Sequence, residues 1–196
     1  MNIKIQEATQ AQSGDIARLV MMAMTDECCQ NLAGPHGTLD GFALLMNRLT
    51  ASVGTQYSYI NTLVAVADDG AVMGAVVSYD GARLHELRAA FIEGARTSLG
   101  IDHSGMDDET RPGEWYIDSL AVYPQYRGNG VAHALLAAAA DRAAAHGLPA
   151  ALLVDKGNPG AERLYRSVGF AYVEDAEWGG HAMRRLRKDA RHTGLA

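Results

Sequence analysis

Gly128 and Gly130 stand one residue apart, between the apolar run "WYIDSLAV" and the alanine-rich stretch "VAHALLAAAADRAAAHG". The first run predicts a strand and the second a helix, because alanine is the best helix former. A glycine turn between a strand and a helix can bind an anion, since the first helical amides lack partners and the helix dipole favours negative charge. Glycine also lets a phosphate approach the backbone, because no Cβ intervenes. The alternative is that both glycines only shape a tight turn.

Two familiar phosphate-binding motifs do not fit this junction. The P-loop pattern G-x-x-x-x-G-K-[ST] does not occur in the chain. The dinucleotide fingerprint G-x-G-x-x-G would place His133 where a third small residue lets helix and strand pack closely. The spacing therefore argues against both motifs.

A third pattern does fit. Gln125-x-x-Gly128-x-Gly130 resembles the Q/R-x-x-G-x-G/A signature of the GNAT family, the GCN5-related N-acetyltransferases. Further along, "NPGAERLYRSVGF" resembles the second signature of that family, N-x-x-A-x-x-x-Y followed by G-F. The two segments bracket residues 118–170, whereas the segment 80–113 is longer than a minimal member of the family needs.

The resemblance implies acetyl-CoA as the donor of an acetyl group. In such a fold the backbone of the central strand pairs with the pantetheine arm like an added strand, which asks little of side-chain identity. The amides of the glycine loop would hold the pyrophosphate, and the Asn158 side chain would cap its helix, contact the pantetheine amides, or do both. The cofactor-binding residues implied in this way are Leu120, Ala121, Val122, Gln125, Arg127, Gly128, Asn129, Gly130, Val131, Ala132, Asn158 and Tyr165.

The resemblance also implies direct transfer of the acetyl group from the thioester to an amine, without a covalent enzyme intermediate. An alkyl amine with a pKa near 10.4 is only about 0.1% neutral around pH 7, so a base has to take its proton. Asp118 is the first candidate for this base and Glu114 the second. Their numbers differ by four, so both would face the same side of a regular strand. The alternative role for Asp118 is a structural cap or ion pair.

Tyr165 matches the tyrosine of the second signature, which in the family often protonates the sulfur of CoA. Proton transfer from a tyrosine with a pKa near 10 to a thiolate near 8.5 runs uphill by roughly 2 kcal/mol. We therefore expect a hydrogen bond that stabilises the leaving sulfur. A backbone amide near Leu120–Val122 would stabilise the oxyanion. The alternative for Tyr165 is a core tyrosine on a short helix.

The remaining pattern predicts a mixed α/β sheet of the GNAT acyl-CoA N-acyltransferase type, in one domain over residues 1–196. A first strand, two helices and a hairpin at Asp68-Asp69-Gly70 precede a helix-plus-loop insertion over residues 80–113. A strand, a helix, a second strand parallel to the first, a short helix and two closing strands follow. Residues 187–196 are expected to form a tail, and the basic run "MRRLRKDARH" is expected to be solvated.

Composition excludes several classes of function. The net charge of −6 disfavours broad contact with nucleic acid or with an anionic membrane. No apolar run reaches the roughly 20 residues of a membrane helix, and the amino terminus lacks an apolar signal core. Adjacent Cys28 and Cys29 are poorly placed for an ordinary disulfide, which suits a reducing cytoplasm. The histidines show no metal-binding spacing, so no metal is expected.

The function expected from these features is an acetyl-CoA-dependent N-acetyltransferase. Its acceptor would be a primary amine of a small molecule or peptide, and a homodimer through the terminal strands is compatible with the pattern. Acidic residues of the 80–113 segment could form a rim that attracts a cationic amine, or could simply be a solvated loop. The alternative function is a non-catalytic acyl-CoA-binding regulatory module, which would have less need of Tyr165.

Overall fold

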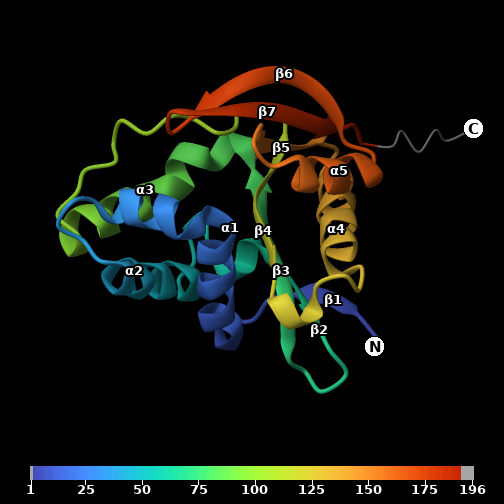
Figure 1. The fold of residues 1–196 in the computed structure, drawn as a ribbon, viewed down its shortest axis with the longest axis horizontal. Helices are drawn as coiled ribbons and strands as arrows, with labels where there is room; N and C mark the ends of the chain where they lie inside the picture. The colour runs from blue at the N-terminus through green and yellow to red at the C-terminus, as the bar shows by residue number, and fades with distance from the viewer. Residues whose placement is uncertain (1, 191–196) are drawn as a thin grey trace, which may run out of the picture.

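The computed structural model describes residues 2–190 and contains a seven-stranded mixed sheet (Figure 1). The spatial order of the strands is β1-β2-β3-β4-β5-β7-β6. Their bounds are β1 Lys4–Glu7, β2 Thr62–Val66, β3 Val72–Asp80, β4 Trp115–Val122, β5 Ala150–Asp155, β6 Ala171–Trp178 and β7 His181–Lys188. The helices are α1 Ser13–Ala33, α2 Leu39–Ala51, α3 Leu84–Ser98, α4 Val131–Ala145 and α5 Pro159–Ser167.

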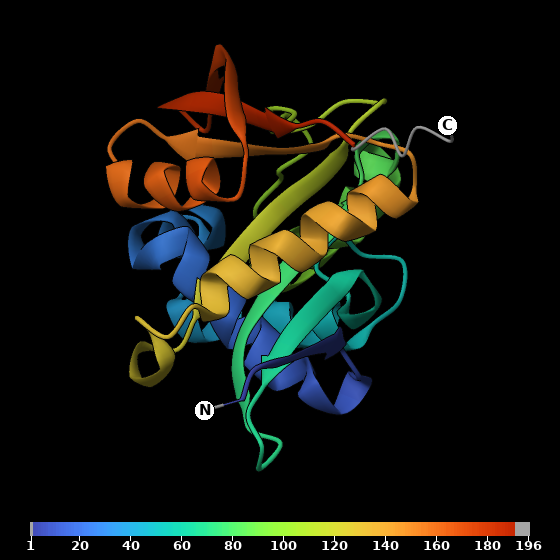
Figure 2. The same cartoon turned by 90° about the vertical axis from the view of Figure 1, so that its right-hand side faces the viewer.

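Helices cover both faces of the sheet. Helices α1, α2 and α3 lie on one face, and α4 and α5 lie on the other (Figures 1 and 2). Each face has its own buried cluster, because α1 to α3 present apolar side chains to one side of β2, β3 and β4, while α4 presents its own to the other. Figure 2 shows α4 crossing the sheet diagonally, so that its amino-terminal end lies beside the end of β4.

The predicted fold class is confirmed, and most elements lie where the sequence places them. The expected hairpin joins β2 to β3, with Gly70 at φ +84° and the Gly70 amide donating to the Ala67 carbonyl. Strand β5 pairs parallel to β4, as predicted. The predicted first helix differs: α1 is interrupted at Thr25, which has φ +72° and ψ +156°, so two helical pieces meet there.

Strands β4 and β5 are paired over only their first residues. The register has two rungs, Trp115 with Ala150 and Tyr116 with Ala151, and the rest of β4 has no partner on that side. On its other edge β4 pairs with β3 along its length, with an irregularity at which Val77 opposes Ser119 and Ser78 opposes Ile117. Asp118 is the extra residue at this bulge. Bulges bend a strand and redirect its side chains, so they are common beside functional sites.

The 80–113 segment folds as a short 3-10 turn, helix α3 and a loop that returns to β4. The expectation of a solvated basic run at the end of the chain is wrong at Arg185, whereas Arg184 and Arg187 keep 38% and 45% of their side-chain surface exposed. Residues 183–188 belong to β7, where Arg185 is only 7% exposed and pairs with Glu114. Residues 191–196 of the expected tail lie outside the described residues.

Candidate functional site

The junction between β4 and α4 leaves helical amides without partners. Gly128 and Gly130 both have left-handed backbones, with φ +77° and φ +80°, which side chains other than glycine rarely adopt. Gly130 is the N-cap of α4 and provides no side chain to cap the first amides. Ala134 is the first residue of α4 whose amide has a backbone partner, and it donates to the Gly130 carbonyl. The turn can therefore offer several amides and the positive end of the helix dipole to an anion.

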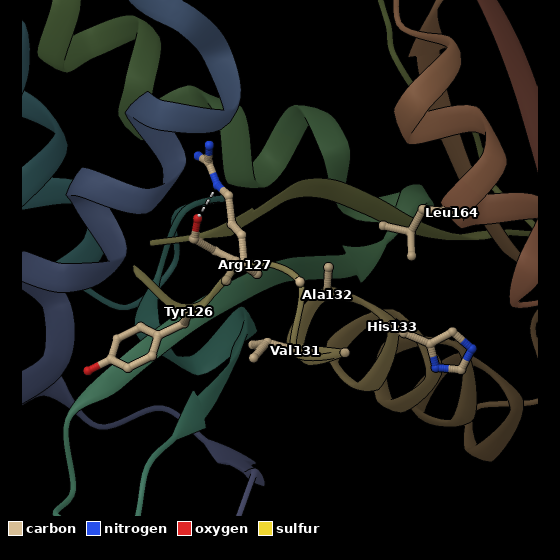
Figure 3. Close-up of a pocket in the computed structure, with 9 residues that line it drawn as sticks. Tyr126, Arg127, Val131, Ala132, His133 and Leu164 are labelled. Carbon is tan, nitrogen blue, oxygen red and sulfur yellow. Dashed lines mark hydrogen bonds between the residues drawn. The ribbon is translucent and has the colours of Figure 1, made fainter. Parts of the chain in front are cut away.

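A pocket of about 300 Å³ opens at this junction (Figure 3). Its lining contains six of the residues predicted to bind the cofactor, together with Tyr126, His133 and Leu164, which the sequence motif did not indicate. A Cβ built at either glycine would have no heavy atom within 4 Å, so the space beside both is open. The six predicted residues in the lining are Val122, Arg127, Gly128, Gly130, Val131 and Ala132.

The other predicted loop residues have different roles. The Nε of Arg127 donates to the Val122 carbonyl at 3.0 Å, which fixes the guanidinium beside the turn (Figure 3). The Asn129 side chain donates to the carbonyls of Tyr126 and Arg127, so it stabilises the loop itself. Gln125 is exposed and does not line the pocket.

One edge of β4 is free to pair with an extended ligand. Leu120, Ala121 and Val122 pair with β3 on one side, opposite Val76, Ala75 and Gly74. On the β5 side the ladder ends at Tyr116, so the backbone groups of the following residues on that edge have no strand partner. Strand addition needs only such main-chain groups.

Helix α5 carries Tyr165 and begins at Asn158. The Oδ1 of Asn158 accepts a hydrogen bond from the Ala161 amide at 3.0 Å, so the capping role is present. The Tyr165 ring packs edge-on against Phe170 with 6.4 Å between the ring centres. Its hydroxyl has no hydrogen-bond partner within residues 2–190, and burial raises its pKa. Burial therefore keeps the phenol protonated and able to donate.

Asp118 lies in a polar cluster on the α1–α3 side of the sheet. Its Oδ2 accepts from the Tyr79 hydroxyl at 2.9 Å and from Nε2 of Gln56 at 3.3 Å, and its Oδ1 accepts from the Ser119 hydroxyl at 2.8 Å. Burial raises the pKa of Asp118, while the bonds from Ser119, Tyr79 and Gln56 lower it in part. A carboxylate with a raised pKa is a stronger base at neutral pH.

Glu109 joins this cluster and was missed by sequence reasoning as a site residue. Its Oε1 lies 3.3 Å from the Tyr79 hydroxyl, and its Oε2 forms an ion pair with Arg88. Burial, followed by the charge of Asp118, raises the pKa of Glu109 to about 7. The available signal was Arg88, which stands four residues after Leu84 and three before Phe91, on the apolar face of α3. A charged residue in that position needs a buried partner.

Arg88 organises the loop that carries Glu109. The guanidinium is 3% exposed and donates to the carbonyls of Met106 and Asp107 as well as to the carboxylates of Asp108 and Glu109. Four successive residues of the loop are therefore held by one buried side chain. The loop has a defined path although it has no regular secondary structure.

Glu114, the second candidate base, has a different environment. It is 4% exposed, its Oε1 lies 2.6 Å from Nη1 of Arg185, and the same oxygen accepts from the Thr110 hydroxyl at 2.8 Å. These partners occupy the carboxylate in a buried ion pair that joins the start of β4 to β7. Of the two predicted candidates, Asp118 has the environment better suited to proton transfer.

A second pocket, of about 280 Å³, lies between the end of α1, the 80–113 loop and the β6–β7 turn. Asp107 is the acidic residue of its lining, and its Oδ2 accepts from the Gly179 amide at 3.0 Å. The expected acidic rim is mostly neutralised, because Glu86 pairs with Arg83 and Glu93 with Arg96. The residues lining this pocket are Cys28, Asn31, Leu32, His103, Gly105, Met106, Asp107, Trp178, Gly179 and His181.

Over residues 2–190 no group of three or more His, Cys, Asp and Glu side chains is arranged to hold a metal ion. No helix within the same range is both long and apolar enough to span a bilayer.

Comparison with solved structures finds proteins of similar architecture. An acetyltransferase crystal structure has 29% sequence identity and a TM-score of 0.79, and the match covers 95% of this chain and 99% of the other. An N-acetyltransferase from Staphylococcus aureus Mu50 has 24% identity and a TM-score of 0.77, with 94% and 99% covered. A structure of the NatC complex bound to Gag peptide and CoA has 16% identity and a TM-score of 0.56, with 96% and 99% covered. Curated proteins give no significant match.

The family comparison agrees with the structural ones. A model of the Acetyltransferase (GNAT) family matches residues 43–170, which include β2 to β5, the glycine turn, α4 and α5. The match spans more than half of the chain and contains both predicted signatures. The chain therefore belongs to the GNAT acetyltransferase family.

Proposed function

We propose that this protein transfers an acetyl group from acetyl-CoA directly to a primary amine of a small molecule or peptide, in a ternary complex. The observation that carries the proposal is the pocket at the β4–α4 junction beside an unpaired strand edge. A diphosphate fits a glycine turn with free amides, and a pantetheine arm fits a strand edge that continues from it.

The residues of the chain have separate tasks in this proposal. The amides of Gly128 to Ala132 and the guanidinium of Arg127 bind the pyrophosphate. The edge of β4 from Leu120 to Val122 orients the pantetheine arm, and one of its amides donates to the developing oxyanion. The bound donor supplies a thioester that an amine can attack.

Two further groups handle protons. Asp118 takes a proton from the acceptor ammonium, directly or through water, so that the nitrogen lone pair becomes available. Tyr165 donates a hydrogen bond to the leaving sulfur. Because burial raises the Tyr165 pKa, full transfer of its proton to the thiolate is still less favourable than for a free tyrosine.

The acceptor is proposed to be cationic. The cluster contains two carboxylates, Asp118 and Glu109. The buried guanidinium of Arg88 pairs with Glu109 and also with Asp108. That of Arg185 pairs with Glu114. An ammonium group would restore the balance of charge. An acceptor panel in which neutral or anionic amines react fastest would contradict this assignment.

The test begins with calorimetric titration of acetyl-CoA, followed by an acceptor screen with Tyr165→Phe as the matched variant. The expected outcome is unchanged acetyl-CoA affinity and a drop in kcat of about 100-fold, the lower end of the range for losing one proton donor. A well-folded protein that binds acetyl-CoA but acetylates no amine would favour the regulatory binding module instead.

A further inference from the structure

The Tyr79 hydroxyl is shared by two carboxylates. Its oxygen lies 2.9 Å from Oδ2 of Asp118 and 3.3 Å from Oε1 of Glu109. A phenol has one hydrogen to donate, whereas an ionised carboxylate only accepts. The single phenolic hydrogen is therefore shared between the two carboxylates, and the shorter contact is the one to Asp118. Two carboxylates held around one phenolic hydrogen repel each other, so a proton taken up by either of them is stabilised.

We propose that Glu109, carried by the 80–113 segment, is a positioning residue that makes a single two-carboxylate proton acceptor with Asp118. This proposal rests on the proposed function and extends it by assigning the 80–113 segment a part in the reaction. Arg88 holds Glu109 in place, and Tyr79 transmits its effect to Asp118. Asp118 alone is proposed to meet the acceptor.

The chemical step is a simple deprotonation. An N–H bond of the acceptor ammonium breaks, the proton goes to the carboxylate pair, and the electron pair stays on nitrogen. The neutral nitrogen then attacks the acetyl carbonyl carbon to form a tetrahedral intermediate, which collapses as the C–S bond breaks. The nitrogen loses a second proton as the amide forms, and the leaving thiolate, which accepts a hydrogen bond from Tyr165, takes up that proton. The pair afterwards loses its proton to water, which returns it to the starting state.

The surroundings of the pair support a raised proton affinity. Burial raises the pKa of both carboxyl groups, and the negative charge of Asp118 raises that of Glu109 further, to about 7. The positive charge of Arg88 lowers these pKa values, but Arg88 pairs with Asp108 as well as with Glu109. The other titratable or charged groups around the pair are Tyr57, Tyr79 and Tyr116, together with Arg185, whose Nη2 donates to the Glu109 carbonyl.

The chain offers a matched control in Asp108. Asp108 and Glu109 both pair with Arg88, but Asp108 is 47% exposed and makes no hydrogen bond to Tyr79 or Asp118. Asp108→Asn therefore removes a charge from Arg88 without touching the pair. Glu109→Gln removes the charge that faces Asp118, and Tyr79→Phe removes the bridging hydroxyl.

The experiment follows the ¹³C carboxyl signals of Asp118 and Glu109 by NMR from pH 4 to 9 in the free protein. We expect an upper transition near pH 7, because the pKa of Glu109 is raised to about 7. Glu109→Gln should lower the Asp118 midpoint by about one pH unit or more, because a neighbouring negative charge is lost. Tyr79→Phe should raise it, because a bond to the ionised form is lost. Asp108→Asn should leave it unchanged.

Two results would overturn the proposal. The first is an Asp118 midpoint that does not respond to Glu109→Gln or to Tyr79→Phe. The second is a carboxyl transition that moves while the acid limb of the kcat/KM profile stays fixed. Failure of the proposed function can be distinguished from failure of this proposal. If no amine is acetylated, the titration of the free protein still decides whether the two carboxylates act as a pair.

Discussion

The β4–α4 junction and the Arg88–Glu109 cluster illustrate two ways to build a site. The junction uses backbone groups from neighbouring residues, and its two glycines provide the required conformations. The cluster uses side chains from α3, its loop, β3, β4 and the segment before β2. The first depends on local conformation and the second on tertiary packing. Substitutions should therefore affect ligand affinity in one region and folding in the other.

The largest effect is expected for Arg88→Met. Removing the guanidinium leaves the Glu109 carboxylate buried without its partner, and breaking a buried pair in this way costs about 3–5 kcal/mol. Urea unfolding at pH 7 measures the change. Arg96→Met is the control on the same helix, because its pair with Glu93 is exposed to solvent and should contribute little to stability. Equal losses in the two variants would mean that Arg88 does not stabilise the cluster.

The next effect concerns pH. The Glu109 pKa is raised from 4.5 to about 7 in the folded protein, so the folded state binds this proton more tightly than the unfolded state does. The resulting stability is present below pH 4.5 and is lost as the pH rises through 7. Relative to Glu109→Gln, the wild-type protein should lose on the order of 3 kcal/mol over that interval. Denaturant unfolding at the two ends of this pH interval measures the free energy of unfolding of both proteins. An equal change in the wild-type protein and in Glu109→Gln would contradict the prediction.

The junction is tested by Gly128→Glu. A side chain at φ +77° strains the turn, and a carboxylate there repels a diphosphate, so acetyl-CoA affinity should fall by about 100-fold or more. Gly70→Glu is the matched control, since Gly70 has φ +84° and equally open surroundings in the β2–β3 hairpin. The control should bear the same strain and bind normally by calorimetry. Loss of binding in both variants would point to general destabilisation.

The smallest effect is expected at Asn158, where the two proposed roles can be separated. Asn158→Ala removes the cap on the Ala161 amide and should cost about 1 kcal/mol of stability. Asn158→Asp keeps an oxygen in the capping position and should retain that stability. If both variants lose acetyl-CoA affinity equally, the amide nitrogen contacts the donor. If only the alanine variant binds more weakly, the cap accounts for the effect.

The sequence predicted the elements around the junction because their signals are local. The hairpin at Gly70, the helix beginning at Asn158 and Pro159, and the strand–turn–helix at residues 115–145 each depend on residues close together in the chain. Glu109 could not be assigned in this way. It appears in the sequence as one acid among several in a polar loop, and its contacts with Arg88 and Tyr79 span 21 and 30 positions.

The bulge at Asp118 was equally inaccessible to sequence reasoning. The prediction that Asp118 and Glu114 share one face requires a regular strand, whereas β4 begins only at Trp115 and its pairing with β3 is irregular at Asp118. Likewise, charge density suggested a solvated tail at residues 183–192, whereas Arg185 completes a buried pair with Glu114. Whether a charge is solvated or paired depends on what lies opposite it across the sheet.

The anchoring of the 106–109 loop by Arg88 has a consequence for diversification. Arg88 holds residues 106 and 107 through their backbone carbonyls, so substitution of the Met106 or Asp107 side chain leaves these two contacts with Arg88 in place. Both residues line the second pocket. Relatives that keep an arginine at the position of Arg88 could therefore exchange pocket walls, and with them acceptor preference, while inheriting the proton-handling groups intact.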